Sequence, residues 1–169
     1  MGGGRYTAGP PMPARTLVCL CLLLASCGTV RDWRYLRSDP MPVAQCYDGI
    51  VEIAAGEFAQ DPAQSDRGNG VFVSRWRQRV KDNRHLARNR LRVELLLDEG
   101  SAQTGWPVRF HIEQETIKDL RRDESPREQD WSADGQDAGK EALFQERLLR
   151  KIAPKSGPLG LDAPGANRP

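Results

Sequence analysis

The chain has 169 residues, 28% of them charged, and a formal net charge of +2. Its mean hydropathy is −0.62. These values fit one soluble domain with a modest core, and they exclude a protein built mainly of membrane-spanning segments.

Residues 1–26 have the layout of a secretory signal peptide. Arg5 and Arg15 give a positively charged start, and residues 16–25 form a short apolar centre. Met12 is an alternative first residue that leaves a more compact charged region before this centre. Because the apolar run is about half the ~20 residues that a transmembrane helix needs, we interpret it as a targeting segment.

The signal peptide ends in Leu24-Ala25-Ser26-Cys27, which resembles the lipobox of bacterial lipoproteins. The resemblance implies cleavage before Cys27 and attachment of a diacylglycerol group to its sulfur. Gly28, where aspartate favours inner-membrane retention, implies an outer-membrane protein that faces the periplasm if the host is Gram-negative. An ordinary signal peptide with an unrelated cysteine is the alternative interpretation.

Removal of residues 1–26 changes the balance of charge and of cysteine. The remaining chain has 23 basic and 23 acidic residues, so its net charge is zero. Cys19 and Cys21 leave with the signal peptide, and lipid occupies Cys27. Cys46 is then the one thiol of the domain, and the sequence predicts no intrachain disulfide.

The segment after the signal peptide is expected to be a tether followed by a helix. Residues 27–42 carry the lipid and form a tether that packs locally through Trp33, Tyr35 and Leu36. Residues 43–58 repeat apolar side chains with a helical period. The apolar positions of this predicted helix are Val43, Cys46, Tyr47, Ile50, Val51, Ile53, Ala54 and Phe58.

Three runs of the central region have the composition or alternation of strands. They cover residues 71–77, 91–97 and 106–116. The residues between the last two runs, 98–105, suit a hairpin turn. Residues 118–137 are charged and irregular, and no strand is predicted there.

A second helix is predicted over residues 138–153, followed by a disordered tail at 154–169 that is rich in Pro and Gly. The predicted order is α-β-β-β-α. We therefore expect a single α+β domain over residues 43–153, with a three-stranded antiparallel meander flanked by two helices on one face.

The strongest charge feature is a run of arginines at alternating positions, which we consider a candidate site for an anion or a partner. Its members are Arg75, Arg77, Arg79, Arg88, Arg90 and Arg92. One interpretation is a surface that binds anionic lipid, glycan or an acidic protein. The other is pairing within the fold, because residues 113–137 hold nine acids against four bases. Nucleic acid is not an expected partner outside the cytoplasm.

No pattern in the sequence favours catalysis or metal binding. Arg109, His111, Glu113 and Glu115 alternate along one predicted strand, but a metal site needs further ligands that converge on it. Cys46 lies on the apolar side of its helix, which favours a buried structural cysteine. Hydrolase, metalloprotease and phosphate-loop motifs are missing from the sequence. We therefore expect no enzyme, cofactor or metal.

These features together favour a non-enzymatic, membrane-anchored envelope protein. Its architecture resembles the small accessory lipoproteins of envelope assembly machines, and this likeness implies a protein partner or a role in assembly. Binding of anionic lipid or glycan by the arginine run is the alternative.

Overall fold

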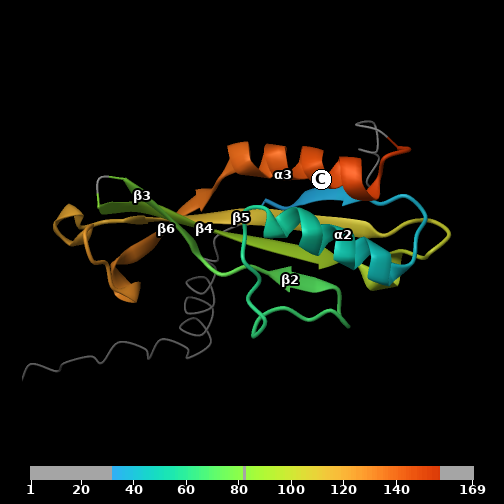
Figure 1. Cartoon of the computed structure of the whole chain (residues 1–169), viewed down its shortest axis with the longest axis horizontal. Helices are drawn as coiled ribbons and strands as arrows, with labels where there is room; N and C mark the ends of the chain where they lie inside the picture. Colours follow the sequence, from blue (N-terminus) through green and yellow to red (C-terminus); the bar gives the residue numbers. More distant parts are fainter. Residues whose placement is uncertain (1–31, 82, 157–169) are drawn as a thin grey trace, which may run out of the picture. The chain divides into compact units, whose positions relative to one another are not determined.

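The computed structural model describes residues 32–156 apart from Asp82. The Cys27 motif and most of the predicted tail lie outside these residues. The elements in chain order are β1 (Arg34–Arg37), α2 (Val43–Ala55), β2 (Val71–Val73), β3 (Arg77–Lys81), β4 (Arg84–Leu95), a 3₁₀ helix (Leu97–Glu99), β5 (Pro107–Ile117), two 3₁₀ helices (Leu120–Arg122, Glu128–Asp130), β6 (Trp131–Gln136) and α3 (Ala138–Ile152). The described chain is a mixed α+β fold, with one antiparallel sheet of six strands and two helices (Figure 1).

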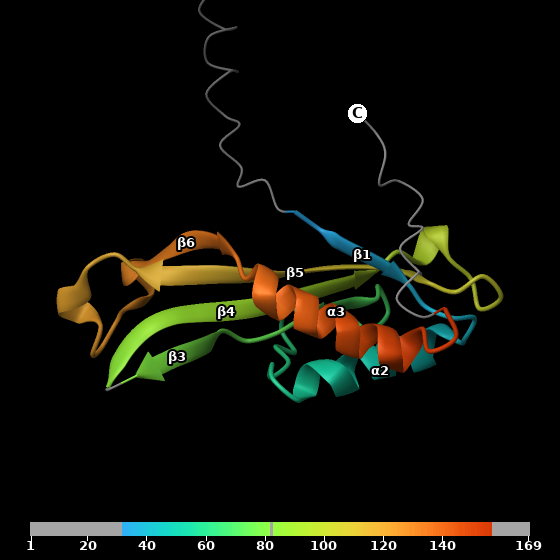
Figure 2. The same ribbon diagram turned by 90° about the horizontal axis from the view of Figure 1, so that it is seen from above.

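Strands β4 and β5 form a long hairpin at the centre of the sheet, and each has its outer edge divided between two shorter strands. Strands β2 and β3 both pair with β4, while β1 and β6 both pair with β5. The register of the central pair runs from Ala87 opposite Thr116 to Leu95 opposite Val108. Figure 2 shows β1 and β6 along the β5 side of this hairpin and β3 along the β4 side.

On both outer edges of the hairpin, one short strand gives way to the next at the row where Leu91 faces Ile112. On the β4 side, the Ser74 amide donates to Leu91 O at 2.9 Å, and Ser74 Oγ accepts from the Leu91 amide at 3.0 Å. On the β5 side, the Asp137 amide donates to Ile112 O at 3.0 Å, and Glu141 Oε1 accepts from the Ile112 amide at 2.9 Å. These contacts satisfy backbone groups that no neighbouring strand reaches.

The hydrophobic core lies between one face of the sheet and the two helices. Alternate residues of β4 and β5 supply the sheet side, as the period of two in the sequence predicted. The buried side chains of this layer are Leu91, Val93, Leu95, Val108, Phe110 and Ile112 from the sheet, Cys46, Tyr47, Ile50 and Ala54 from α2, and Phe144, Leu148 and Ile152 from α3. Both helices therefore cover the same face, as predicted.

The sheet differs from the predicted three-stranded meander. The predicted strand 71–77 is divided into β2 and β3, because Ser74 turns toward Leu91 between them. Two further strands, β1 and β6, lie in segments for which no strand was predicted. The β6 sequence contains Gly135 at a φ of +80° and lacks the alternating apolar residues that indicate strands. The residues of β1 and β6 have little strand propensity of their own, so these edge strands form because they pair with β5.

The expected tether and tail both contribute to the folded unit. Strand β1 comes from the segment expected to be a tether, and its Leu36 is 2% exposed in the core. Beyond α3, the Lys155 amide and Ser156 Oγ donate to the Asp39 carboxylate at 2.9 and 2.7 Å. The folded unit thus begins before Val43 and extends at least to Ser156.

Replacement of Gly105 by alanine tests the packing of the β4–β5 hairpin against β1. Gly105 has a φ of +77°, and a Cβ there would lie 2.0 Å from Ser38 O. We expect Gly105→Ala to lower the free energy of unfolding in urea by about 2 kcal/mol or more. Gly135 has a similar φ of +80° but nothing within 4 Å of the added Cβ, so Gly135→Ala costs only about 1 kcal/mol. Equal losses in the two variants would contradict the close approach at Ser38.

Candidate functional site

Three of the candidate arginines lie together on the face of the sheet opposite the helices, which we call the open face. Arg88, Arg90 and Arg92 alternate along β4 with residues that face the core, such as Leu91 and Val93. They share this face with the residues opposite them on β5, as the register requires. The alternation predicted from the sequence is therefore confirmed for this group.

The arginines of β3 point to the other side of the sheet. Arg77 pairs in register with Asn89, and Arg79 pairs with Ala87, so both share the side that the helices occupy. Arg75 lies before β3 and is exposed. The run of six arginines consequently does not form one continuous surface.

Arg88 is the most completely enclosed of these arginines, with its side chain 5% exposed. Its Nε donates to Glu115 at 2.7 Å, and its two terminal nitrogens donate to both carboxylate oxygens of Glu128. The guanidinium also lies 4.5 Å from the ring centroid of Trp76 and 4.8 Å from that of Trp131. Two acids and two aromatic rings surround Arg88, so each of its three nitrogens already donates to a carboxylate of the same domain.

The remaining charges of the open face also pair across strands. Arg90 Nη2 donates to Glu113 at 2.7 Å. Glu94 accepts from Arg92 Nε at 2.7 Å and from Arg109 Nε at 2.8 Å. The acids that neutralise Arg88 and Arg90 come from residues 113–137, so the interpretation that pairs these arginines within the fold is confirmed.

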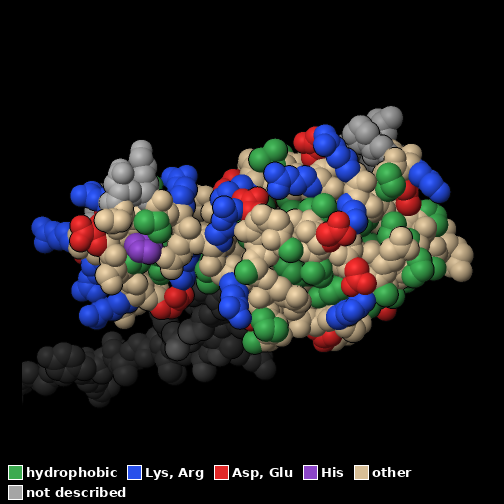
Figure 3. All heavy atoms as spheres, in the orientation of Figure 1, with side chains coloured by type: hydrophobic (Ala, Val, Ile, Leu, Met, Phe, Trp, Pro, Cys, Tyr) green, Lys and Arg blue, Asp and Glu red, His purple; other side chains and the backbone are tan. Residues whose placement is uncertain are grey.

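The arginines outside the open face are more accessible. Arg77 is 53% exposed and pairs with Glu57 at 2.6 Å. Arg75 and Arg79 are exposed and form no ion pair within the part of the chain that the structure describes. Figure 3 shows basic side chains gathered at the end of the sheet near β3 and mixed with acidic ones elsewhere on that face.

His111 is fully buried on β5 between aromatic and acidic neighbours. Its Nε2 lies 3.2 Å from Glu113 Oε1, and its ring makes an edge contact with Trp33 at a centroid distance of 4.2 Å. The Arg109 guanidinium stacks on the same Trp33 ring, 4.5 Å from its centroid. His111 Nδ1 has no hydrogen-bond partner among the described residues. The alternating residues of β5 thus share one face, but their side chains are already engaged in ion pairs and in contacts with the Trp33 ring.

Cys46 is buried in the core, as its place on the helix predicted. Burial raises the pKa of its thiol to about 11, against a smaller opposing effect of the Ser38 side chain. The thiolate that nucleophilic chemistry needs is therefore scarce at neutral pH.

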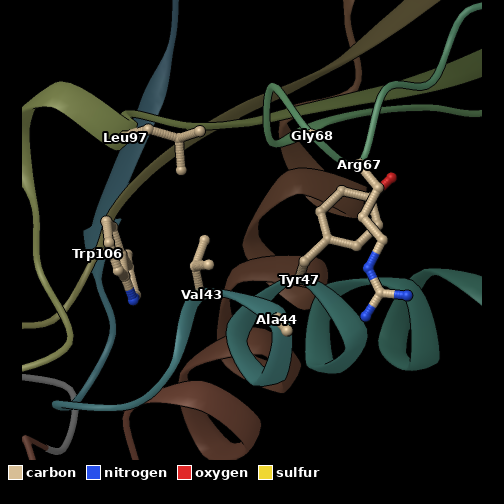
Figure 4. A pocket seen from close by; sticks show the side chains of 7 residues that line it. All are labelled: Val43, Ala44, Tyr47, Arg67, Gly68, Leu97 and Trp106. Atoms are coloured by element: carbon tan, nitrogen blue, oxygen red, sulfur yellow. The ribbon is translucent and has the colours of Figure 1, made fainter.

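A shallow groove of about 300 Å³ lies beside the first turns of α2. Figure 4 shows side chains from α2, from the loop after it and from both ends of the β4–β5 connection around the groove. The lining residues are Val43, Ala44, Tyr47, Arg67, Gly68, Leu97 and Trp106. Trp106 Nε1 donates to Met41 O at 2.8 Å, which fixes the ring at one end of the groove. The lining is largely apolar, and Arg67 supplies its charged group.

Sequence reasoning missed the groove and the stacking of tryptophan on arginine. Trp131 is buried at 9% exposure, and Trp76 is half-buried. Their partner is nevertheless a guanidinium. The alternating arginines beside Trp76 were the one available signal, since arginine commonly stacks on aromatic rings.

Neutralisation of Glu94 tests the ion pairs of the open face. Burial opposes the charged form of Glu94, but hydrogen bonds from Arg109 and Arg92 outweigh it and lower the pKa of this carboxyl. We expect Glu94→Gln to reduce the free energy of unfolding at pH 7 by about 1–2 kcal/mol. A lowered folded pKa stabilises the protein above the ordinary value of 4.5, and this contribution is lost as the pH falls through the folded pKa.

The difference between Glu94→Gln and the parent chain should therefore shrink in urea denaturation below pH 4.5. Glu146→Gln is the matched control, because Glu146 is 57% exposed and pairs with Arg150 within α3. Its expected cost is about 0.5 kcal/mol or less. An undiminished difference for Glu94→Gln in acid would assign the effect to packing rather than charge.

No metal-binding cluster, membrane-spanning helix or related protein assigns a function to the described part of the chain. Among the described residues, no group of three or more His, Cys, Asp and Glu side chains is placed to hold a metal ion. No helix in the same part of the chain has the length and apolar character needed to cross a membrane. No family model matches the chain, and no curated protein matches it. Proposals about function therefore depend on the sequence motif and the geometry described above.

Proposed function

We propose that the chain is a lipid-anchored lipoprotein of the bacterial cell envelope whose α+β domain binds a protein partner or supports envelope assembly, without catalysing a reaction. In a Gram-negative host its place is the outer membrane, on the periplasmic side. The observation that carries this proposal is the Leu24-Ala25-Ser26-Cys27 motif, which overlaps the end of the apolar run 16–25. Two or three acyl chains at Cys27, each CH₂ contributing about 0.8 kcal/mol when buried, give stable anchoring.

The balance of charge supports a protein partner. The chain from Cys27 onward has equal numbers of acidic and basic residues. Arg88 and Arg90 are engaged by acids of the same domain. Long-range attraction to an anionic surface is correspondingly weak, whereas packed protein interfaces combine apolar contact with mixed charge. The apolar groove beside α2 supplies surface of that type.

Binding of anionic lipid or glycan is a second candidate function. The observation that favours it is the exposure of Arg75 and Arg79 without an ion pair among the described residues. Arg77 is exposed as well, but it pairs with Glu57. The basic surface available to a ligand is therefore smaller than the run of six arginines suggested.

Lipid attachment is tested by replacement of Cys27. In cells supplied with an alkyne-bearing fatty acid, we expect the parent chain to be labelled and to sediment with the membranes. Cys27→Ser should lose the label and the membrane association that depends on the acyl chains, because serine has no thiol to accept the diacylglycerol group. Cys46→Ala is the matched control and should keep both, since this buried thiol is not the attachment point. Label on Cys27→Ser would overturn the assignment.

The kind of partner is tested by crosslinking in the native envelope at low and high salt. A packed protein interface should give the same crosslinked protein at both, and also in the double variant Arg75→Glu/Arg79→Glu. Charge-led binding weakens steeply with ionic strength, because the Debye length falls from about 10 Å at 0.1 M to about 3 Å at 1 M. Loss of the crosslink at high salt and in the double variant would favour the anionic ligand instead.

A further inference from the structure

The folded unit includes the chain from Asp32 onward. The Asp32 amide donates to Gln136 Oε1 at 2.8 Å, and Gln136 Nε2 donates back to Asp32 O at 2.9 Å. Strand β1 begins two residues later and pairs with β5 from Arg34 opposite Phe110. Trp33, between these contacts, lies against His111 and Arg109.

The connection between the proposed lipid attachment point and this folded unit is short. Five residue steps separate Cys27 from Asp32. A fully extended chain spans at most about 3.6 Å per residue, so the two Cα atoms lie within about 18 Å of each other. The tether expected over residues 27–42 would have reached roughly 50 Å. Because β1 belongs to the sheet, the connection between Cys27 and the folded unit reaches only about a third as far as the expected tether.

The side chains nearest this connection are of the types that occupy membrane interfaces. Tyr35 is opposite Arg109 in the register and therefore lies on the open face, where it is 42% exposed. Trp33 contacts residues of the same face. The side chains of Arg92 and Arg109 remain 38% and 34% exposed although both pair with Glu94. Tryptophan and tyrosine are enriched at the level of lipid headgroups, and long basic side chains are found beside them there.

We propose that the open face around Trp33 and Tyr35 lies on the phospholipid headgroup layer of the membrane. This inference rests on the proposed lipidation of Cys27. The acyl chains hold the domain at the surface, and the short connection determines which face meets it. Net charge plays little part, because the arginines of this face are paired with glutamates. The helices α2 and α3 cover the opposite face of the sheet and are turned toward the aqueous phase.

Fluorescence quenching by lipid tests this orientation. The lipidated protein in the Cys46→Ala background carries a small fluorophore at Tyr35→Cys or, as the matched control, at Leu143→Cys. Leu143 is 54% exposed on α3, on the side that the proposal turns away from the membrane. Each protein is reconstituted in phosphatidylcholine vesicles with or without a lipid that bears a nitroxide quencher near its headgroup. We expect about twofold quenching at position 35 and little change at position 143, because headgroups form a layer only some 5–7 Å thick.

A variant with twenty Gly and Ser residues inserted after Gly28 tests the role of the short connection. Its flexible chain has an average span of roughly 25 Å from the insert alone, so quenching at position 35 should fall toward that at position 143. Equal quenching at the two positions in the uninserted protein, or quenching at position 143 alone, would overturn the proposed orientation. Quenching that persists unchanged in the long variant would overturn the role of the short connection.

Mass spectrometry of the same samples separates the two proposals. If Cys27 carries no diacylglycerol group, the proposed function fails, and the proposed orientation fails with it. If Cys27 is lipidated and the quenching pattern is reversed or uniform, the proposed orientation alone fails.

Discussion

The row of the sheet in which Leu91 faces Ile112 is the constraint on which the other strands depend. At this row both outer edges of the central hairpin pass from one short strand to the next. A buried backbone amide or carbonyl without a partner costs about 1–3 kcal/mol, so each gap needs its own donor and acceptor. Ser74 supplies them on one side, and Asp137 with Glu141 supplies them on the other. The start of α3 is therefore part of the sheet's hydrogen bonding as well as of its core.

The same hairpin sorts the chain's charge into pairs. Alternate positions of β4 and β5 face the helices with apolar side chains, and the intervening positions bring arginine and glutamate together on the open face. Cross-strand neighbours of opposite charge stabilise such a face, and the stacked rings of Trp76 and Trp131 add contact area around Arg88. A run of arginines in sequence is thus not a basic surface when its neighbouring strand carries the complementary acids.

Periodicity predicted the parts of the fold with a strong amphipathic pattern and missed the parts held by their neighbours. Helices α2 and α3 and the cores of β4 and β5 carry clear repeats, and they form close to the predicted positions. Strand β6, with the sequence WSADGQ, and strand β1, with RYLR, have no such repeat and exist through pairing with β5. At the site, charge counting offered pairing within the fold as one of two interpretations, and Arg88 and Arg90 do pair with acids of residues 113–137. The aromatic rings and the groove depend on tertiary contacts that no local pattern records.

Incorporation of β1 into the sheet connects the fold to the proposed location. A long tether would let every face of the domain meet a partner or the membrane, because the domain could turn freely about its anchor. A connection of five residue steps from Cys27 to Asp32 removes most of that freedom. The pairing of Arg34–Arg37 with β5 then fixes the edge of the sheet from which the chain leaves. Under the proposed lipidation, a soluble partner meets the helical side of the domain first, and lipid meets the open face.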